Sequence, residues 1–241
     1  MITVFFHKVQ LAVTYTHSAA WEGTIPAAQG TSLPRTLEKL KNGKPLTIVC
    51  YGHSITAGCN ASANINAQPY APRWTDLVTQ RLRLLYPDAV ITAWNDAVGG
   101  KDSAWGAENA VGVAERNPDL VIIAFGLNDA NQGARTGAFE ESIRAIMDTS
   151  RAANPDCEFI LVSPMRSNAE AWDFRAEPLN SYLRALQAMT GEGVALADMT
   201  TLHTYLLTRK SYRDMTGNNV NHPNDFLARA YAQVLLRTME E

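Results

Sequence analysis

Hydrophobic residues along this chain form short continuous runs, separated by longer stretches in which apolar positions recur every three or four residues. Continuous runs of four to six residues are typical of strands buried on both faces, and the recurring pattern is typical of amphipathic helices. The runs that predict strands are residues 46–51, 90–94, 120–125, 159–163 and 194–197. The stretches that predict helices are residues 73–86, 107–115, 139–153, 179–190, 202–208 and 226–239.

Strands that alternate with helices in this way predict an α/β fold, in which a parallel sheet is covered by helices on both faces. Asp225 precedes the last helix and is the expected N-cap residue, because a short acidic side chain there accepts hydrogen bonds from the first free backbone N–H groups. In open sheets of this kind, ligands bind at the carboxyl ends of the strands. Polar residues that directly follow the strands are therefore the candidate functional residues.

The first 44 residues do not share this pattern. Residues 2–15 are rich in β-branched and aromatic side chains and predict one or two strands. Residues 17–44 contain Pro26, Pro34 and several turn signals, with a short helical piece around Leu37, and predict an extended linker. We therefore expect residues 1–44 to be a β-rich segment and linker, the candidate remnant of a β-domain, and residues 45–241 to form the α/β domain.

Composition narrows the functional classes. Hydrophobic residues make up 46% of the 241 positions and charged residues 19%, which is ordinary for a soluble globular protein. The net charge of −3 does not indicate binding to nucleic acid, which is negatively charged. No apolar run is long enough to form a membrane-spanning helix. Three cysteines without a CxxC pair indicate neither a disulfide framework nor a zinc site. No signal peptide is evident, which slightly favours a cytoplasmic location. The oligomeric state is not indicated.

The polar residues at the predicted strand ends are those that acyl-transfer chemistry uses. Ser54 follows the first strand, Gly99 and Gly100 follow the second, Asn128 follows the third, and His222 comes shortly before the last helix. A serine becomes a nucleophile when a base takes its proton, and histidine is the commonest such base. Backbone N–H groups and an asparagine amide stabilise the oxyanion that forms in such a reaction.

In this arrangement the chain resembles the SGNH hydrolases, a branch of the GDSL esterase/lipase family. Gly52-His53-Ser54, the segment 95–100, Gly126-Leu127-Asn128-Asp129 and His222-Pro223 resemble four sequence blocks of that family, in the same order, from about residue 45 to the C-terminus. The resemblance implies a flavodoxin-like three-layer αβα sandwich with a five-stranded parallel sheet. It also implies that Ser54 is the nucleophile, that His222 is the base, and that Ser54, Gly100 and Asn128 form the oxyanion hole.

Two positions depart from the family pattern. His53 stands where the family has aspartate beside the nucleophile, and we expect it to shape the turn rather than to act as a base. Asn219 stands three residues before His222, where the family has the aspartate that orients the imidazole. Asparagine can orient a ring only through its oxygen and adds no charge. Four alternatives remain open: Asn219 itself, a nearby backbone carbonyl, and a carboxylate from either Asp214 or Asp225.

The sequence therefore predicts a serine ester hydrolase that removes small acyl groups, acetyl above all, from a carbohydrate or similar alcohol through an acyl-enzyme. Neither a metal nor an organic cofactor is expected. The expected partner is a small-molecule or oligosaccharide ester, and Trp105 is a candidate substrate-binding residue beside the second block. The alternatives are a lysophospholipase or thioesterase of the same family, or a catalytically impaired relative that binds carbohydrate.

Overall fold

The computed structural model describes residues 18, 20–171 and 178–241, and its centre is a five-stranded parallel sheet. The strands are β1 (Leu46–Gly52), β2 (Ile91–Asn95), β3 (Leu120–Ala124), β4 (Glu158–Val162) and β5 (Val194–Ala197). They lie in the order β2-β1-β3-β4-β5, and each neighbouring pair is parallel. Each strand end lies within one residue of its predicted position, so the sheet expected from the apolar runs is confirmed.

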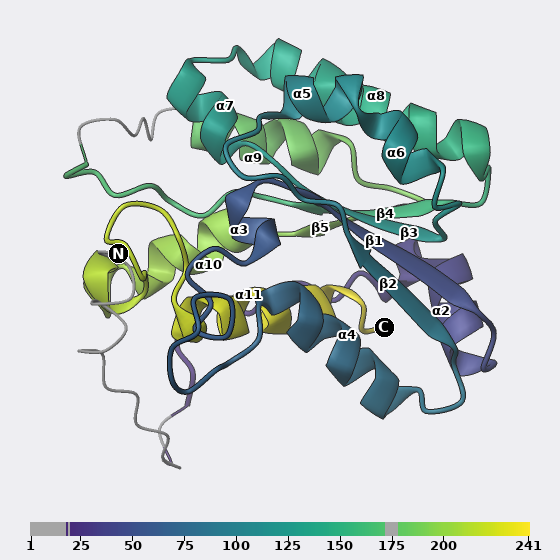
Figure 1. The fold of residues 1–241 in the computed structure, drawn as a ribbon, viewed down its shortest axis with the longest axis horizontal. Helices are drawn as coiled ribbons and strands as arrows, with labels where there is room; N and C mark the ends of the chain where they lie inside the picture. The colour runs from purple at the N-terminus through teal and green to yellow at the C-terminus, as the bar shows by residue number, and fades with distance from the viewer. Residues whose placement is uncertain (1–17, 19, 172–177) are drawn as a thin grey trace.

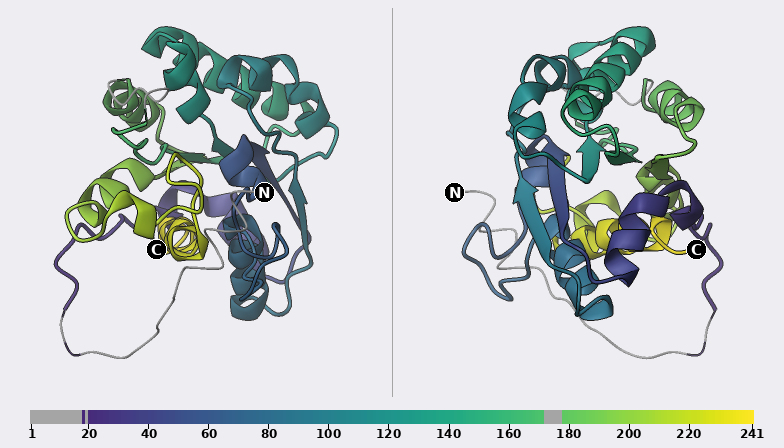
Figure 2. Two further views of the ribbon diagram at one scale, coloured as in Figure 1. Left: turned by 60° about the vertical axis from the view of Figure 1, so that its left-hand side comes forward. Right: turned by 90° about the vertical axis from the view of Figure 1, so that its right-hand side faces the viewer.

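Helices cover both faces of the sheet and form the three-layer sandwich that was predicted (Figures 1 and 2). The helices of one face are α5 (Ser103–Glu108), α6 (Ala110–Ala114), α7 (Leu127–Gln132), α8 (Thr136–Ala153) and α9 (Leu179–Ala188). Those of the other face are α2 (Pro34–Lys41), α4 (Trp74–Leu85) and α11 (Asp225–Thr238). Two short helices lie near the strand ends, α3 (Ser54–Ala57) after β1 and α10 (Met199–Leu206) after β5. No helix in the described part of the chain is long and apolar enough to cross a membrane.

Most predicted helices are present, and two of the differences lie at helix ends where a side chain caps the backbone. The helix expected at 107–115 begins earlier, at Ser103, because the Asp102 carboxylate accepts a hydrogen bond from the Trp105 N–H. It is also divided in two at Asn109. Helix α10 begins at Met199 rather than at residue 202, because Asp198 caps it by accepting a hydrogen bond from Thr201 N–H.

The predicted cap of the last helix is wrong by one residue. Asn224, not Asp225, is the N-cap of α11, and its side-chain oxygen accepts hydrogen bonds from the N–H groups of Phe226 and Leu227. Asp225 is the first residue of the helix, and its carboxylate instead accepts a hydrogen bond from Ser62 N–H at 2.9 Å. Asp225 therefore ties the start of α11 to a loop that follows α3, which matters for the site described below.

Part of the N-terminal segment belongs to the packing of the α/β unit. Leu33, Leu37 and Leu40, in and before α2, are buried in the same core as the sheet. The buried Glu158 carboxylate of β4 accepts hydrogen bonds from the first backbone N–H groups of α2, those of Arg35 and Thr36. A domain boundary at residue 45 thus divides residues that pack together. The strands predicted within residues 2–15 lie outside the described residues.

The strand order places the carboxyl ends of β1, β2 and β3 beside one another. The chain leaves β1 for β2 on one side and later returns to add β3 on the other side, so the order reverses at β1. In open parallel sheets such a reversal leaves a crevice at the carboxyl ends of the strands, where ligands bind. The segments that follow β1, β2 and β3 contain Ser54, Gly100 and Asn128, respectively.

Candidate active site

Ser54 lies at the sharp turn between β1 and α3, and it is buried apart from a small exposed fraction of 8%. Position 52, the last residue of β1, has to be glycine, because a Cβ atom there would lie 2.4 Å from the Ala124 carbonyl oxygen of β3, a contact too close for any side chain. His53 is the N-cap of α3, since its Nδ1 accepts a hydrogen bond from Ile55 N–H. The hydroxyl of Ser54 is therefore not used to cap the helix.

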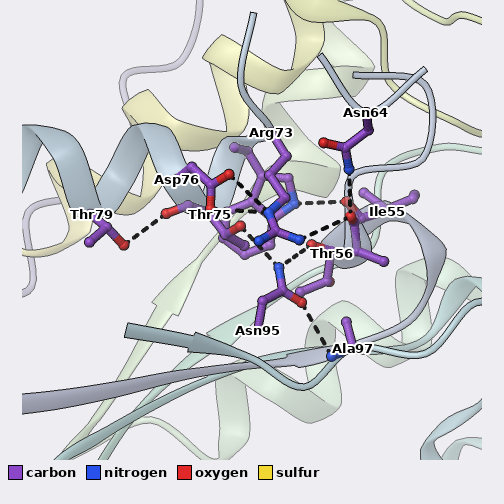
Figure 3. Close-up of polar contacts among 11 residues, drawn as sticks. Ile55, Thr56, Asn64, Arg73, Thr75, Asp76, Thr79, Asn95 and Ala97 are labelled. Atoms are coloured by element: carbon purple, nitrogen blue, oxygen red, sulfur yellow. Dashed lines mark hydrogen bonds and ion pairs between the residues drawn. The ribbon is translucent and has the colours of Figure 1, made fainter. Parts of the chain in front are cut away.

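Residues of two elements, β2 and α4, hold the backbone of this turn in place (Figure 3). Asn95, at the end of β2, donates from its amide to the Thr56 carbonyl at 2.8 Å and to the Thr75 hydroxyl at 3.0 Å. The indole N–H of Trp74 donates to the Ile55 carbonyl at 3.1 Å. These contacts join α3 to β2 and α4, so the backbone that carries Ser54 has little freedom to move.

His222 reaches Ser54 from the loop before α11. Its Nε2 lies 2.9 Å from the Ser54 hydroxyl oxygen, although 168 positions separate the two residues. The loop folds back on itself, because Gly217 N–H donates to the His222 carbonyl and Asn224 N–H donates to the Met215 carbonyl. The structure thus brings together the predicted nucleophile and base at hydrogen-bonding distance.

The other ring nitrogen of His222 faces two asparagine amides. Its Nδ1 lies 2.9 Å from Oδ1 of Asn60 and 3.1 Å from Nδ2 of Asn218. The oxygen of Asn218 accepts hydrogen bonds from three backbone N–H groups, those of Val220, Asn221 and His222, so this side chain shapes the loop. The sequence reasoning found neither asparagine. Asn60 offers no sequence signal, since it belongs to no family block and is 162 positions from the histidine that it contacts.

The residues predicted to orient His222 lie elsewhere. In the described part of the chain, Asn219 makes no hydrogen bond to the imidazole, and its backbone carbonyl accepts one from the Asn168 amide at 2.7 Å. The Asp214 carboxylate accepts a hydrogen bond from the Ser211 hydroxyl at 2.5 Å, and the Asp225 carboxylate accepts one from Ser62 N–H. Among the described residues, then, the groups at Nδ1 are amides rather than carboxylates.

This environment keeps the imidazole neutral. Burial lowers the pKa of His222 to about 4, because the charged ring loses solvation. Burial also lowers the pKa of His53, to about 3, with a smaller contribution from repulsion by a charged His222. Both rings are thus uncharged near neutral pH, and a neutral His222 is able to accept a proton at Nε2.

The opposite side of Ser54 is formed by the segments after β2 and β3. Gly100 has a left-handed backbone, with φ of 78°, and a Cβ atom there would meet nothing within 4 Å, so its backbone faces open space. The Asn128 amide donates to the Lys101 carbonyl at 2.7 Å, which uses one of its two hydrogens and orients the group toward the Gly100 segment. Gly100 and Asn128, the predicted oxyanion donors besides Ser54, therefore come from adjoining segments.

A buried carboxylate joins these two segments. Asp129 accepts hydrogen bonds from both the N–H and the hydroxyl of Ser103, and from Gly126 N–H at 2.9 Å. Burial raises the pKa of Asp129, while these hydrogen bonds act in the opposite direction. Asp129 thus fixes the start of α5 against the start of α7.

Trp105 lies next to this region, on α5. Its ring is partly buried against Tyr51, with the ring centroids 6.2 Å apart, and the Lys101 ammonium lies 5.4 Å from its centroid. Part of the indole remains accessible beside the segment of Gly100. No group of three or more His, Cys, Asp or Glu side chains among the described residues is arranged to hold a metal ion.

A family model described as the GDSL-like lipase/acylhydrolase family matches residues 50–230 of the chain. This range contains all four blocks that the sequence analysis identified, from the Ser54 turn to His222. A search among curated proteins finds no match.

Solved structures with the same fold include a two-domain esterase, CEX, that is active on acetylated mannans. Its TM-score is 0.67 at 21% identity, over 88% of this chain and 53% of that one, so this chain spans about half the length of CEX. Axe2, an acetylxylan esterase from Geobacillus stearothermophilus, has a TM-score of 0.64 at 18% identity, over 80% of this chain and 94% of that one. TesA has a TM-score of 0.61 at 19% identity, and the alignment covers 80% of this chain and 97% of TesA. At these identities the likeness establishes the fold.

Proposed function

The chain belongs to the GDSL-like lipase/acylhydrolase family and is a carboxylic ester hydrolase, and on that premise we propose that it removes acetyl or similarly small acyl groups from a carbohydrate alcohol through a Ser54–His222 pair. The observation that carries this proposal is the 2.9 Å separation of Ser54 Oγ and His222 Nε2. It is within the range in which a base takes a proton from a hydroxyl nucleophile.

The reaction has two halves. In the first, Ser54 Oγ attacks the ester carbonyl carbon while its proton passes to Nε2 of His222, and that proton then goes to the leaving alcohol. In the second, water attacks the acyl-Ser54 carbonyl, gives its proton to His222, and releases the carboxylic acid as the proton returns to Ser54. In both halves the N–H groups of Ser54 and Gly100 and the free amide hydrogen of Asn128 stabilise the oxyanion.

The substrate class rests on two further observations. Two proteins of the same fold are described as esterases acting on acetylated mannans and on acetylxylan. In addition, the large apolar groove of about 490 Å³ lies elsewhere, over α10 and α11, and none of the four candidate catalytic residues lines it. A small acyl group on a polar alcohol needs no long apolar channel, and the partly exposed ring of Trp105 is a candidate surface for packing against a sugar ring.

The test compares the protein with its Ser54→Ala variant on p-nitrophenyl acetate, p-nitrophenyl octanoate and acetylated xylo- and manno-oligosaccharides. We expect the wild type to release acetate from the oligosaccharides and to prefer acetyl to octanoyl, and we expect Ser54→Ala to reduce kcat by at least 1,000-fold. Covalent labelling of Ser54 by a fluorophosphonate provides a second measurement.

A preference for octanoate would keep the mechanism and overturn the proposed substrate class. Folded wild-type protein without Ser54-dependent turnover on any of these esters, and without labelling, would overturn the mechanism.

A further inference from the structure

The side chain of Asn60 occupies the place beside His222 where a hydrolase of this type needs an orienting group. We propose that Asn60 is the positioning residue of this site: its amide oxygen holds Nδ1–H of His222 and so keeps Nε2 free to take the Ser54 proton. This inference rests on the proposed function, because the proton transfer that it serves is the one proposed between Ser54 and His222.

The geometry places the imidazole between two partners. Nε2 lies 2.9 Å from Ser54 Oγ, and Nδ1 lies 2.9 Å from Asn60 Oδ1. A neutral imidazole carries its single proton on one nitrogen only, so the hydrogen bond at Nδ1 determines whether Nε2 can act as a base. An amide oxygen at Nδ1 requires the proton there, and this is the reactive tautomer.

Asn218 is the competing group, because its Nδ2 lies 3.1 Å from the same Nδ1 and would favour the unreactive tautomer. The Asn218 amide cannot rotate by 180° without losing the three backbone hydrogen bonds that its oxygen accepts. Asn218 Nδ2 nevertheless has another acceptor, Oδ1 of Asn221 at 3.1 Å. Among the described residues, Asn60 Oδ1 has no donor other than His222. With the Asn60 amide in this orientation, in which its buried Nδ2 has no partner among the described residues, the tautomer with the proton on Nδ1 satisfies both Asn60 Oδ1 and Asn218 Nδ2.

The backbone holds Asn60 firmly in this place. The residue is only 4% exposed and has a left-handed conformation, with φ of 73°. Just before it, Cys59 N–H donates to the Ser54 carbonyl at 2.9 Å. Just after it, Ser62 N–H donates to the Asp225 carboxylate at 2.9 Å. Asn60 is thus tied on one side to the nucleophile turn and on the other to the helix that follows His222.

A neutral orienting group differs from a carboxylate in one respect. In serine proteases, exchange of the orienting aspartate for asparagine leaves the geometry intact but reduces kcat by about 10⁴-fold, because the amide stabilises the wrong tautomer. Here the orientation of the Asn60 amide supplies the correct tautomer, but it adds no charge to stabilise the imidazolium. We therefore expect the base to remain unprotonated, and the enzyme to remain active, at acidic pH.

Within residues 20–171 and 178–241, the other titratable groups near His222 do not replace that charge. His53 packs beside the nucleophile and is neutral, since burial lowers its pKa to about 3. Asp214 is paired with the Ser211 hydroxyl, and Asp225 is paired with Ser62 N–H. The pH dependence of the base is thus determined by burial and by the amides at Nδ1.

The test uses two substitutions at Asn60 and a matched control. Asn60→Gly deletes the amide and keeps the left-handed backbone without strain, because glycine adopts positive φ readily. Asn60→Asp retains the shape and adds the charge. The control is Asn66→Asp, which introduces the same charge in the same loop at an exposed residue that also has positive φ, 54°.

We expect Asn60→Gly to reduce kcat by 10- to 1,000-fold with less than a threefold change in KM. We expect Asn60→Asp to retain activity at neutral pH and to raise the acid limb of the kcat/KM profile by at least one pH unit, while Asn66→Asp leaves that limb within about 0.3 unit. Long-range ¹H–¹⁵N correlation spectra, assigned with His222→Gln, should show the wild-type proton on Nδ1 and a mixed tautomer in Asn60→Gly.

If Asn60→Gly keeps the kcat, the pH profile and the His222 tautomer of the wild type, the proposal is overturned. It is also overturned if Asn219→Ala loses kcat while Asn60→Gly does not. The spectra do not depend on turnover. If the wild type hydrolyses no ester the proposed function fails, yet the tautomer measurement still decides the role of Asn60.

Discussion

The two sides of the proposed active site are held together by different chemistry. On the oxyanion side, the buried carboxylate of Asp129 joins the segments after β2 and β3 through hydrogen bonds from Ser103 and Gly126. On the histidine side, neutral amides have the equivalent place: Asn60 contacts the imidazole and Asn168 holds the carbonyl of Asn219.

The difference follows from what each side has to do. A charge that only holds backbone in place does not disturb the reaction, and a hydrogen bond to a charged group is stronger than one between neutral groups. A charge beside the imidazole would instead raise the pKa of the catalytic base. The site therefore combines a buried carboxylate, Asp129, that holds backbone in place with a proposed base, His222, whose pKa is kept low by burial. Both features can be tested.

The largest effect is expected from removing the Asp129 carboxylate on the oxyanion side. Asp129→Ala removes the acceptor of two buried backbone N–H groups, and leaving buried donors without partners costs about 1–3 kcal/mol each. We expect the free energy of unfolding, measured with urea, to fall by about 3–5 kcal/mol, and kcat to fall with it as the oxyanion donors lose their alignment. Asp129→Asn, which keeps one oxygen, should lose roughly half as much. A decrease in the free energy of unfolding of less than about 1 kcal/mol for Asp129→Ala would show that the Asp129 hydrogen bonds are not needed to hold the two segments together.

The histidine side predicts a pH effect on stability. The pKa of His222 is about 4 in the folded protein and about 6.5 when the chain is unfolded, so between these values the unfolded chain binds more protons. The free energy of unfolding should therefore fall as the pH drops from about 6.5 to about 4, by at most about 3 kcal/mol from this residue. This contribution should level off below pH 4.

Urea unfolding of the wild type and of His222→Gln over pH 4–7 measures that contribution as the difference between the two curves. His203, whose pKa burial lowers to about 4, contributes to both curves alike. His53 contributes nearly alike, since burial is the main cause of its pKa of about 3 and repulsion by His222 is a smaller one. Parallel curves would mean that His222 is not desolvated as the structure indicates.

The smallest effect is expected for Trp105, which lies beside the segment of Gly100. Trp105 packs on Tyr51 and is assigned no part in the proton transfer between Ser54 and His222, so Trp105→Ala should leave kcat within about twofold. We expect KM for acetylated oligosaccharides to rise by roughly two- to fivefold, because one face for sugar packing is lost, while KM for p-nitrophenyl acetate changes less. Tyr86→Ala, which removes an aromatic ring from the end of α4, is the matched control. Equal increases in KM on both substrates would exclude a sugar-binding role for Trp105.

Sequence reasoning succeeded where the signal is local. Each strand is a short apolar run, and Ser54, Gly100 and Asn128 follow directly after β1, β2 and β3. The family assignment, which the model match over residues 50–230 confirms, depends on the same short segments. The failure at Asp225 has the same origin: Asn and Asp are equally good N-caps, and which of two adjacent residues caps the helix depends on the loop that Asp225 holds.

The sequence by itself determined the order of the strands and of most helices, the parallel sheet, and the candidates for the nucleophile and the base, because each depends on a few neighbouring residues. Only the tertiary structure decided which group faces Nδ1 of His222. Asn219 is near in sequence, but its positive φ and its carbonyl bond to Asn168 give it a structural place in the loop. Asn60 reaches the ring from a loop 162 positions away, because the Asp225–Ser62 hydrogen bond brings that loop against the start of α11.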